Sequence, residues 1–372
     1  MPDHPQTNPW TTFLGHCPIV TSYLANRPLS SPTWAFSHGV NTFLRAVGQP
    51  AFVDNPLLGL LILIAIFLPH PHVGAGCILG GGLATATELL VGLHPWGLVS
   101  NGVCAFNGVL TGTVIPILFP LFYGENHNVT HMWIAIAFGA IASVFVASAF
   151  NNFLSKFNVP YMALPFNLII TVIFLTLQPV TMDHVVKRDT SSLEVEGNET
   201  ISGNATLMDH SHHVDADLLE ADLDISWCNV GRGIVVSMGQ VYAVNDVPAS
   251  LVMQLAVLLS SPLLFILSNT GAVIGSLLSL TFLPTSDYQQ VCHNDTVTSF
   301  SRICKNFSTQ VYDGIWGYNS LLSMAAASCV FFPFSPKSLM AGVLNAVATV
   351  GVQAALRRNM DTVRFAAKKL TL

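Results

Sequence analysis

Apolar segments recur along most of the chain, and short turns rich in Gly, Pro, Asn and Ser separate them. A helix needs about 20 mostly apolar residues to cross the hydrocarbon core of a bilayer, and many of these segments approach that length. The pattern predicts an all-α integral membrane protein. Its helices are expected at 55–68, 73–92, 103–122, 132–150, 159–178, 247–268, 271–283, 314–334 and 338–356.

A polar segment near the middle of the chain interrupts this pattern. Residues 181–228 are rich in acidic and Ser residues and hold too little apolar surface to fold alone. They predict an extracellular linker, in which the Asn-x-Thr sequons at Asn198 and Asn204 are candidates for glycosylation. The rest of the chain divides into an N-terminal cytoplasmic segment, two membrane repeats and a basic C-terminal tail, at 1–40, 41–180, 229–356 and 357–372.

The composition agrees with a membrane protein, because 51% of the residues are hydrophobic, only 9% are charged and the mean hydropathy is +0.56. The net charge of −6 does not favour nucleic acid as a partner. The cysteines form no zinc or redox spacing, so no metal or other cofactor is expected, and no enzyme motif is present. Four of the cysteines are interpreted as small apolar core residues: Cys17, Cys77, Cys104 and Cys329.

The two halves of the chain repeat each other. The stretch "VGQPAFVDNP" at 47–56 returns as "MGQVYAVNDVP" at 238–248, so that Gln49 aligns with Gln240. Further on, "VCAFNGVLTG" at 103–112 aligns with "GIWGYNSLLS" at 314–323. Internal repeats of this kind are typical of transporters and channels built from two inverted halves, with the site at their junction. The repeat therefore predicts re-entrant pore helices around a central pore.

The glutamines suit a pore for a neutral solute. An uncharged side-chain amide offers one acceptor and two donor hydrogens, which fits an amide-like molecule. The alternative interpretation is that Gln49 and Gln240 join helices within the membrane, as polar side chains often do. The matched positions of the two residues favour the pore.

At these motifs the sequence resembles the urea transporter family, over about 47–356. The motifs that carry the resemblance are "GQPAFVDNPLLGLLILIAIF", "CAFNGVLTG", "VPYMALPFN", "GQVYAVND" and "GIWGYNSLL". The resemblance implies two homologous halves with re-entrant pore segments and a glycosylated extracellular linker. It also implies a multi-pass homotrimer in the lipid of the plasma membrane, with one pore per subunit. Through that pore, urea passes down its gradient between phenylalanine faces and rows of oxygen acceptors.

The resemblance also assigns residues. Gln49 and Gln240 fall on the family's pore glutamines, and Phe52 falls on an aromatic wall of the slot, where the second half has Ala243. Ala163 stands where the family has a pore Thr. The remaining positions expected to line the urea pore are Phe106, Asn107, Leu164, Pro165, Tyr318 and Asn319.

The chain departs from the family in one motif. Leu-Pro-x-x-Thr-x-Pro-Phe appears as "VPYMALPF" at 159–166, which lacks the threonine hydroxyl. By the internal alignment its second copy would begin at the last residues of the chain, so the second repeat is expected to lack its last helix. Two alternatives to a urea channel follow: a non-conducting shortened subunit that assembles with full-length urea transporters and modulates them, or a relative permeable to ammonia or water.

Two ionisable residues lie at the end of an apolar segment. Glu88 is expected to reach the membrane interface, with a pore role as the alternative, because intramembrane acids are often functional. His94 is expected to be a solvated loop histidine. The linker stretch "DHSHHVDAD" could hold a metal only weakly, because a fluctuating segment rarely fixes a coordination geometry.

Overall fold

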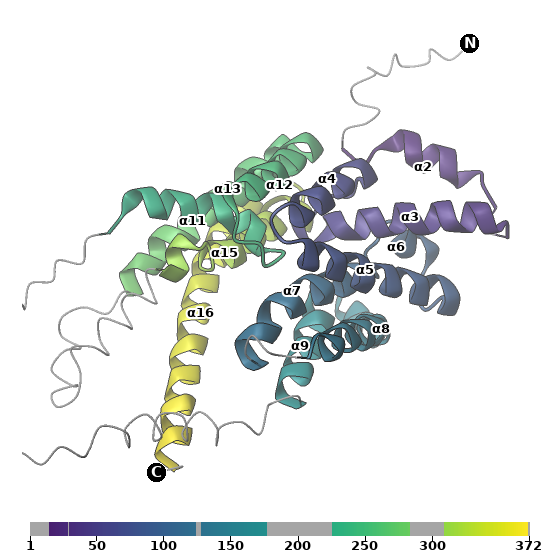
Figure 1. Cartoon of the computed structure of the whole chain (residues 1–372). Coiled ribbons are helices and arrows are strands. Elements are labelled where there is room, and N and C mark those ends of the chain that lie inside the picture. The colour runs from purple at the N-terminus through teal and green to yellow at the C-terminus, as the bar shows by residue number, and fades with distance from the viewer. Residues whose placement is uncertain (1–14, 29, 124–127, 177–224, 283–308, 371–372) are drawn as a thin grey trace, which may run out of the picture.

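The protein is a bundle of helices in two groups (Figure 1). The structure, a computed structural model, describes residues 15–28, 30–123, 128–176, 225–282 and 309–370, and every regular element among them is a helix. The first group comprises α2 (Pro18–Ala25), α3 (Pro32–Gly48), η1 (Gln49–Ala51), α4 (Pro56–Phe67), α5 (Pro71–Val91), α6 (Trp96–Ser100), α7 (Phe106–Tyr123), α8 (Val129–Leu154), η2 (Ser155–Phe157) and α9 (Leu164–Thr176). The second comprises α11 (Trp227–Gln240), α12 (Val247–Ser260), α13 (Pro262–Ser279), η4 (Leu280–Phe282), α15 (Gly317–Ala325), the π-helical turn η6 (Ala326–Val330) and α16 (Pro336–Leu370).

Several of these helices have the length and apolar character of membrane spans. Four qualify as single helices: Pro71–Val91, Val129–Phe157, Pro262–Phe282 and Pro336–Arg357. A fifth candidate is the pair Pro32–Ala51 and Pro56–Phe67, which bends by 71° at the break between its members, as a broken span or a re-entrant loop does. The prediction of an all-α, multi-pass membrane protein is confirmed.

A predicted break between two helices lies at the wrong place. The apolar pattern placed a break between 268 and 271, whereas the structure ends α12 at Ser260 and starts α13 at Pro262. Ser261 is extended and its hydroxyl accepts the N–H of Leu264, which caps the new helix. The Asn-Thr-Gly stretch at 269–271 stays helical, and its polar side chains find partners within the helix: Asn269 Nδ2 donates to the Phe265 carbonyl one turn back, 2.9 Å away.

The halves meet where α4 packs against α12 (Figure 1). Close to this contact the hydroxyl of Tyr242, from the second half, donates a hydrogen bond of 2.7 Å to the carbonyl of Val47, from the first. Both residues are fully buried. Because a buried carbonyl without a partner costs about 1 to 3 kcal/mol, this bond fixes the register between the halves.

Within each half, glycines let two helices approach closely. α5 crosses α7 at Gly80 and Gly108, where a Cβ on Gly80 would lie 2.3 Å from the Gly108 carbonyl oxygen. In the second half α13 crosses α15 at Gly271, where a Cβ would lie 2.4 Å from the Ser320 carbonyl oxygen. Small residues allow such backbone approach inside membranes, where packing and not the hydrophobic effect joins helices.

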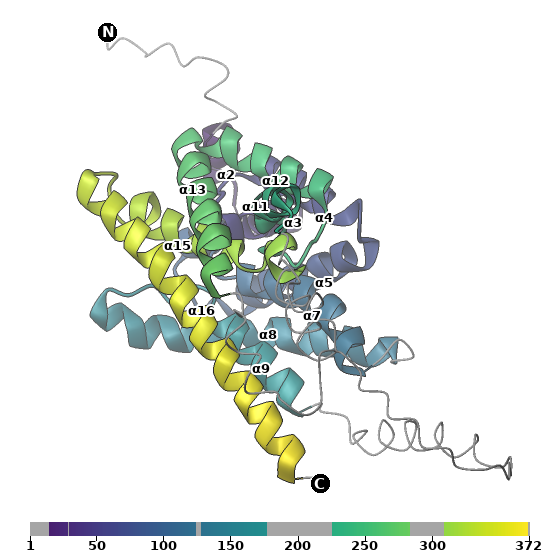
Figure 2. The same ribbon diagram turned by 90° about the vertical axis from the view of Figure 1, so that its left-hand side faces the viewer.

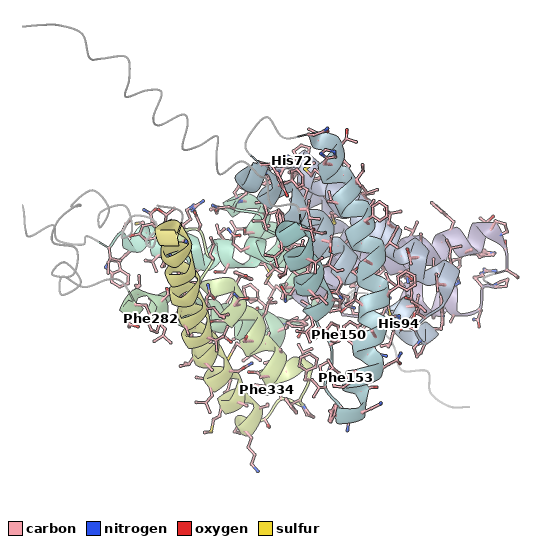
Figure 3. All side chains as sticks on the ribbon, turned by 90° about the horizontal axis from the view of Figure 1, so that it is seen from below. His72, His94, Phe150, Phe153, Phe282 and Phe334 are labelled. Carbon is pink, nitrogen blue, oxygen red and sulfur yellow. The ribbon has the colours of Figure 1, made fainter. Side chains whose placement is uncertain are left out.

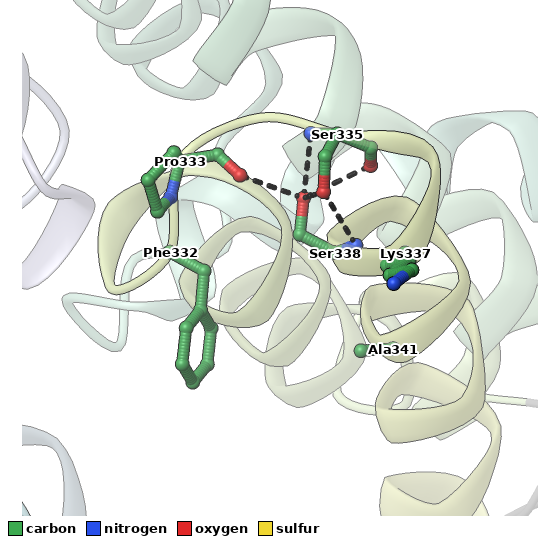
Figure 4. Close-up of a pocket in the computed structure, with 6 residues that line it drawn as sticks. All are labelled: Phe332, Pro333, Ser335, Lys337, Ser338 and Ala341. Carbon is green, nitrogen blue, oxygen red and sulfur yellow. Dashed lines mark hydrogen bonds between the residues drawn. The ribbon is translucent and has the colours of Figure 1, made fainter.

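The longest helix, α16, runs along the outside of the second half and packs on α15 and α13 (Figure 2). Its start is fixed by a serine cluster, in which the Ser338 hydroxyl accepts the N–H of Ser335 at 2.8 Å (Figure 4). The same hydroxyl lies 3.0 Å from the Ser328 carbonyl. These bonds satisfy backbone groups between η6 and α16. A surface hollow beside them is lined by Phe332, Pro333, Ser335, Lys337, Ser338 and Ala341.

We predict that Gly80→Ala destabilises the protein while Gly82→Ala does not. Both sites are inside α5, where Ala is favoured over Gly by about 1 kcal/mol. A Cβ at Gly82 meets nothing within 4 Å, whereas at Gly80 it meets backbone. We expect Gly80→Ala to lower the free energy of unfolding by about 1 to 3 kcal/mol. Thermal unfolding in detergent should therefore show a lower Tm for Gly80→Ala and an unchanged or higher Tm for Gly82→Ala. Equal shifts would contradict close packing at this crossing.

Candidate functional site

Two turns with the same backbone geometry follow α3 and α11. Phe52 and Ala243 both have a φ of 59°, in the left-handed region. In each turn the N–H of that residue donates to the carbonyl of the glutamine three residues earlier, at 2.8 Å to Gln49 and 3.0 Å to Gln240. A left-handed residue other than Gly costs about 1 to 3 kcal/mol and persists only where its surroundings impose it. The aligned sequence stretches therefore fold alike, strain included.

The helices after the turns supply part of that constraint. The Asn55 side chain accepts the N–H groups of Leu57 and Leu58, at 2.9 and 3.3 Å, and so caps α4. Asp246 occupies the equivalent position and accepts the N–H of Ala249 at 2.8 Å, capping α12. Both caps satisfy N–H groups that a helix end inside a membrane would otherwise leave without a partner.

The two glutamine side chains make the same bond. Gln49 Nε2 donates to the Asn101 carbonyl and Gln240 Nε2 donates to the Asp313 carbonyl, both at 2.7 Å. Neither Oε1 atom has a hydrogen-bond partner among the described residues, and both side chains are partly buried. Each glutamine is thus oriented by its nitrogen and has its carbonyl oxygen available as an acceptor.

A glycine follows each residue whose carbonyl accepts these bonds. Gly102 and Gly314 follow the two carbonyl groups and have φ values of 75° and 73°. A Cβ would lie 2.3 Å from the Ala46 nitrogen at the first site and 2.7 Å from the Ser237 nitrogen at the second. The positive φ and the close approach both require glycine.

An arginine lies beside each turn. Arg45 is buried, bonds the carboxylate of Asp54 and the side chain of Asn41, and so has its charge paired. Arg232 is partly exposed and lies 3.0 Å from Asp313 and 2.8 Å from Asn245. Each half thus has a positive charge near its turn, but Arg45 is buried and Arg232 is partly exposed.

Asn107 is fully buried and has both ends of its amide occupied. Its Nδ2 donates to the Met162 carbonyl at 3.3 Å, and its Oδ1 accepts the N–H of Phe166 at 3.1 Å. These bonds hold the turn before α9, which contains Ala163. Met162 in the same turn has a φ of 47°.

Asn319, the aligned residue of the second half, has a different partner. Its Nδ2 donates to Gln353 Oε1 in α16 at 3.1 Å, and Gln353 Nε2 in turn donates to the Ile315 carbonyl at 3.1 Å. No counterpart of α9 follows α16 within the described residues. Asn319 therefore bonds a side chain of α16, whereas its counterpart Asn107 bonds backbone groups of the turn before α9.

The structure brings several of the predicted pore residues into one hydrophobic core that spans both halves. Phe52, Phe106, Ala163 and Tyr318 all belong to it. Pro165 is buried, whereas Leu164 is 47% exposed. The glycosylation candidates Asn198 and Asn204 lie outside the described residues.

The expectations for Glu88 and His94 are wrong. Their relative exposures are 1% and 7%, and His94 donates its backbone N–H to Glu88 Oε1 at 2.8 Å while its Nδ1 lies 2.9 Å from Oε2. Gly92, with a φ of 66°, ends α5 and turns the chain back, so that His94 folds against the helix end. Figure 3 shows His94 well apart from His72, which lies at the other end of α5. The pairing signal was present as an intramembrane acid followed, after a glycine, by a histidine.

Comparisons with known proteins identify relatives over most of the chain. A sequence model described as "Urea transporter" matches residues 40–293 and 298–370. Urea transporter 1 of Capra hircus is 24% identical over 326 residues, which cover 87% of this chain and 72% of that protein. Urea transporter 1 of Ovis aries has the same values, and that of Mus musculus is 23% identical over 333 residues with the same coverage.

We predict that Asn107→Leu destabilises the protein more than Asn319→Leu. The first change removes a fully buried side chain and leaves two partly buried backbone groups, the carbonyl of Met162 and the N–H of Phe166, without a partner, at about 1 kcal/mol or more each. The second removes one partly buried bond between side chains, worth about 1 kcal/mol. Chemical or thermal unfolding in detergent should rank the variants in that order. Equal losses would argue against Asn107 as the support of the turn before α9.

Proposed function

Because the chain belongs to the urea transporter family, we propose that it carries urea across the plasma membrane, passively and down the urea gradient. The family is one of transporters and not of enzymes. The observation that best supports the proposal is the pair of equivalent glutamine turns, each with an amide nitrogen bonded at 2.7 Å and a carbonyl oxygen without a partner among the described residues.

The chemistry of urea fits these acceptors. Urea is planar and uncharged, and its N–H groups lose their water partners in a narrow passage. Carbonyl oxygens that accept those hydrogens replace the lost bonds, at a net value of about 0.5 to 1.5 kcal/mol each. Conduction needs such partial compensation, since a solute held more strongly leaves slowly. Gln49 and Gln240 are the proposed acceptors, one from each half.

Aromatic side chains are the proposed walls of the slot. Phe52, Phe106 and Tyr318 share the core that joins the halves, and flat apolar faces admit a planar molecule without adding strong polar binding. Asn107 and Asn319, together with the segment 163–165, complete the proposed lining. The hydrogen bonds of both asparagines indicate that they also hold the lining in place.

The proposed organisation follows from the repeat. We propose that 41–180 and 229–356 are inverted halves, that 181–228 is an extracellular linker between them, that 1–40 and 357–372 are terminal segments, and that three chains assemble with a pore in each. The matching turns, caps and glycine positions support an internal duplication. Helix α3 begins at Pro32, inside the N-terminal segment as the sequence divided it.

A second candidate function is that of a non-conducting subunit that modulates full-length urea transporters. The bond between Asn319 and Gln353 favours it. In the first half the aligned asparagine bonds the turn before α9, a segment of the proposed pore lining, whereas in the second half a side chain of α16 takes the place of such a turn. Stopped-flow light scattering on vesicles that hold the purified protein in a urea gradient separates the two. Urea permeability equal to that of empty vesicles would reject the channel for this chain.

We predict that Gln49→Leu and Gln240→Leu each lower urea permeability about 2- to 10-fold, the equivalent of one lost acceptor. Stopped-flow measurements at equal protein per vesicle test this. The matched control is Gln254→Leu, since Gln254 also donates its amide to a carbonyl, that of Val235 at 3.0 Å, but between α12 and α11. An equal drop in the control would mean that the glutamines act through folding alone.

We predict that Ala163→Thr raises urea permeability about 2- to 10-fold, because it adds an acceptor hydroxyl where the family has a pore threonine. Ala163 is only partly buried, which leaves room for the larger side chain. Ala163→Val has nearly the same shape without the hydroxyl and should not raise permeability. The proposal for this position fails if Val raises the flux as much as Thr.

A further inference from the structure

A cluster of three metal-ligating side chains shares no residue with the proposed slot, although Cys104 lies two positions before Phe106 in the sequence. Glu88, His94 and Cys104 each offer a ligand atom, and these atoms lie within 4.8 Å of one another. The relative exposures are 1%, 7% and 1%. The residues come from α5, from the turn after it and from the segment that leads into α7, so the fold assembles them from three places.

One atom of the cluster has no partner. His94 Nδ1 lies 2.9 Å from Glu88 Oε2, whereas His94 Nε2 is buried and has no hydrogen-bond partner among the described residues. The hydrogen bonds of the cluster therefore leave it incompletely satisfied. The two nitrogens of an imidazole point in nearly opposite directions, so the one that faces Glu88 is Nδ1. An ion bound by both residues would replace the proton between His94 Nδ1 and Glu88 Oε2.

We propose that Glu88, His94 and Cys104 form a buried site for one thiophilic divalent cation of the Zn²⁺ type. Imidazole nitrogen, thiolate sulfur and carboxylate oxygen are the ligands that Zn²⁺ takes in proteins. With bonds of about 2.0 to 2.3 Å, ligand atoms on a tetrahedral ion lie about 3.5 Å apart. On binding, His94 Nδ1 and Glu88 Oε2, now 2.9 Å apart, would separate slightly, and the Cys104 sulfur would come to the same spacing from within 4.8 Å.

The charges balance in the bound state. The Cys104 thiol releases its proton to solvent when the metal–sulfur bond forms, and the imidazole binds as the neutral ring. A divalent cation with one thiolate and one carboxylate has no net charge, which suits a buried site.

Cobalt titration of the purified full-length protein in detergent, after chelation, tests the site. Co²⁺ bound to a thiolate gives a near-ultraviolet charge-transfer band, which histidines alone do not give. We expect a band that saturates at one Co²⁺ per chain and is displaced by Zn²⁺. It should be lost in Cys104→Ser, and the affinity should fall at least about 10-fold in Glu88→Gln, since loss of even an outer partner of a ligand has an effect of that size.

Two controls make the assignment specific. Cys228→Ser changes an exposed cysteine of α11, and His72→Gln changes an exposed histidine near the far end of α5, so both should keep the band. A wild-type protein that shows no thiolate band overturns the proposal without any variant. A band that survives in Cys104→Ser and disappears in Cys228→Ser also overturns it.

Discussion

The fold depends on satisfying backbone hydrogen-bond groups at places where helices break inside an apolar environment. Hydrocarbon offers no partner to a free N–H or C=O, so irregular backbone at membrane depth survives only where the protein supplies partners. The turns after α3 and α11 supply them locally, through the glutamine carbonyls, and the caps at Asn55 and Asp246 supply them to the helices that follow. The proposed acceptors for urea are thus held by the same groups that permit the breaks.

The halves keep the same turn but complete it differently. The left-handed residue is Phe52 in one half and Ala243 in the other, although both have the same φ. Asn107, at the start of α7, bonds backbone of the turn before α9. Its aligned counterpart in α15, Asn319, bonds the side chain of Gln353 in α16. Backbone geometry is retained because the hydrogen bonds require it, while the side chains that face the junction differ. The proposed slot would therefore have similar backbone supports on its two sides and different side chains as walls.

Much of the fold could be predicted from the sequence, because burial in a bilayer demands apolar length and the repeat showed where the two turns lie. Helices α3 and α11 were missed, since their buried faces carry polar residues such as Arg45 and Ser237. The break at Ser261 was missed because hydropathy does not distinguish a capping serine from a helical one. The pairing of Glu88 with His94 depends on the chain reversal at Gly92, and the acid, the glycine and the histidine that signal it are in the sequence, although hydropathy alone does not connect them.

The bond between Tyr242 and Val47 connects the two turns directly. Val47 immediately precedes the Gly48–Val53 turn, and Tyr242 lies inside the equivalent turn of the second half. A displacement of one turn would therefore break a buried hydrogen bond or move the other turn with it. Alternating access requires one half to rock against the other, and such a bond across the junction opposes that motion. A static slot needs no rocking, so this bond is compatible with the proposed passive passage of urea between fixed acceptors.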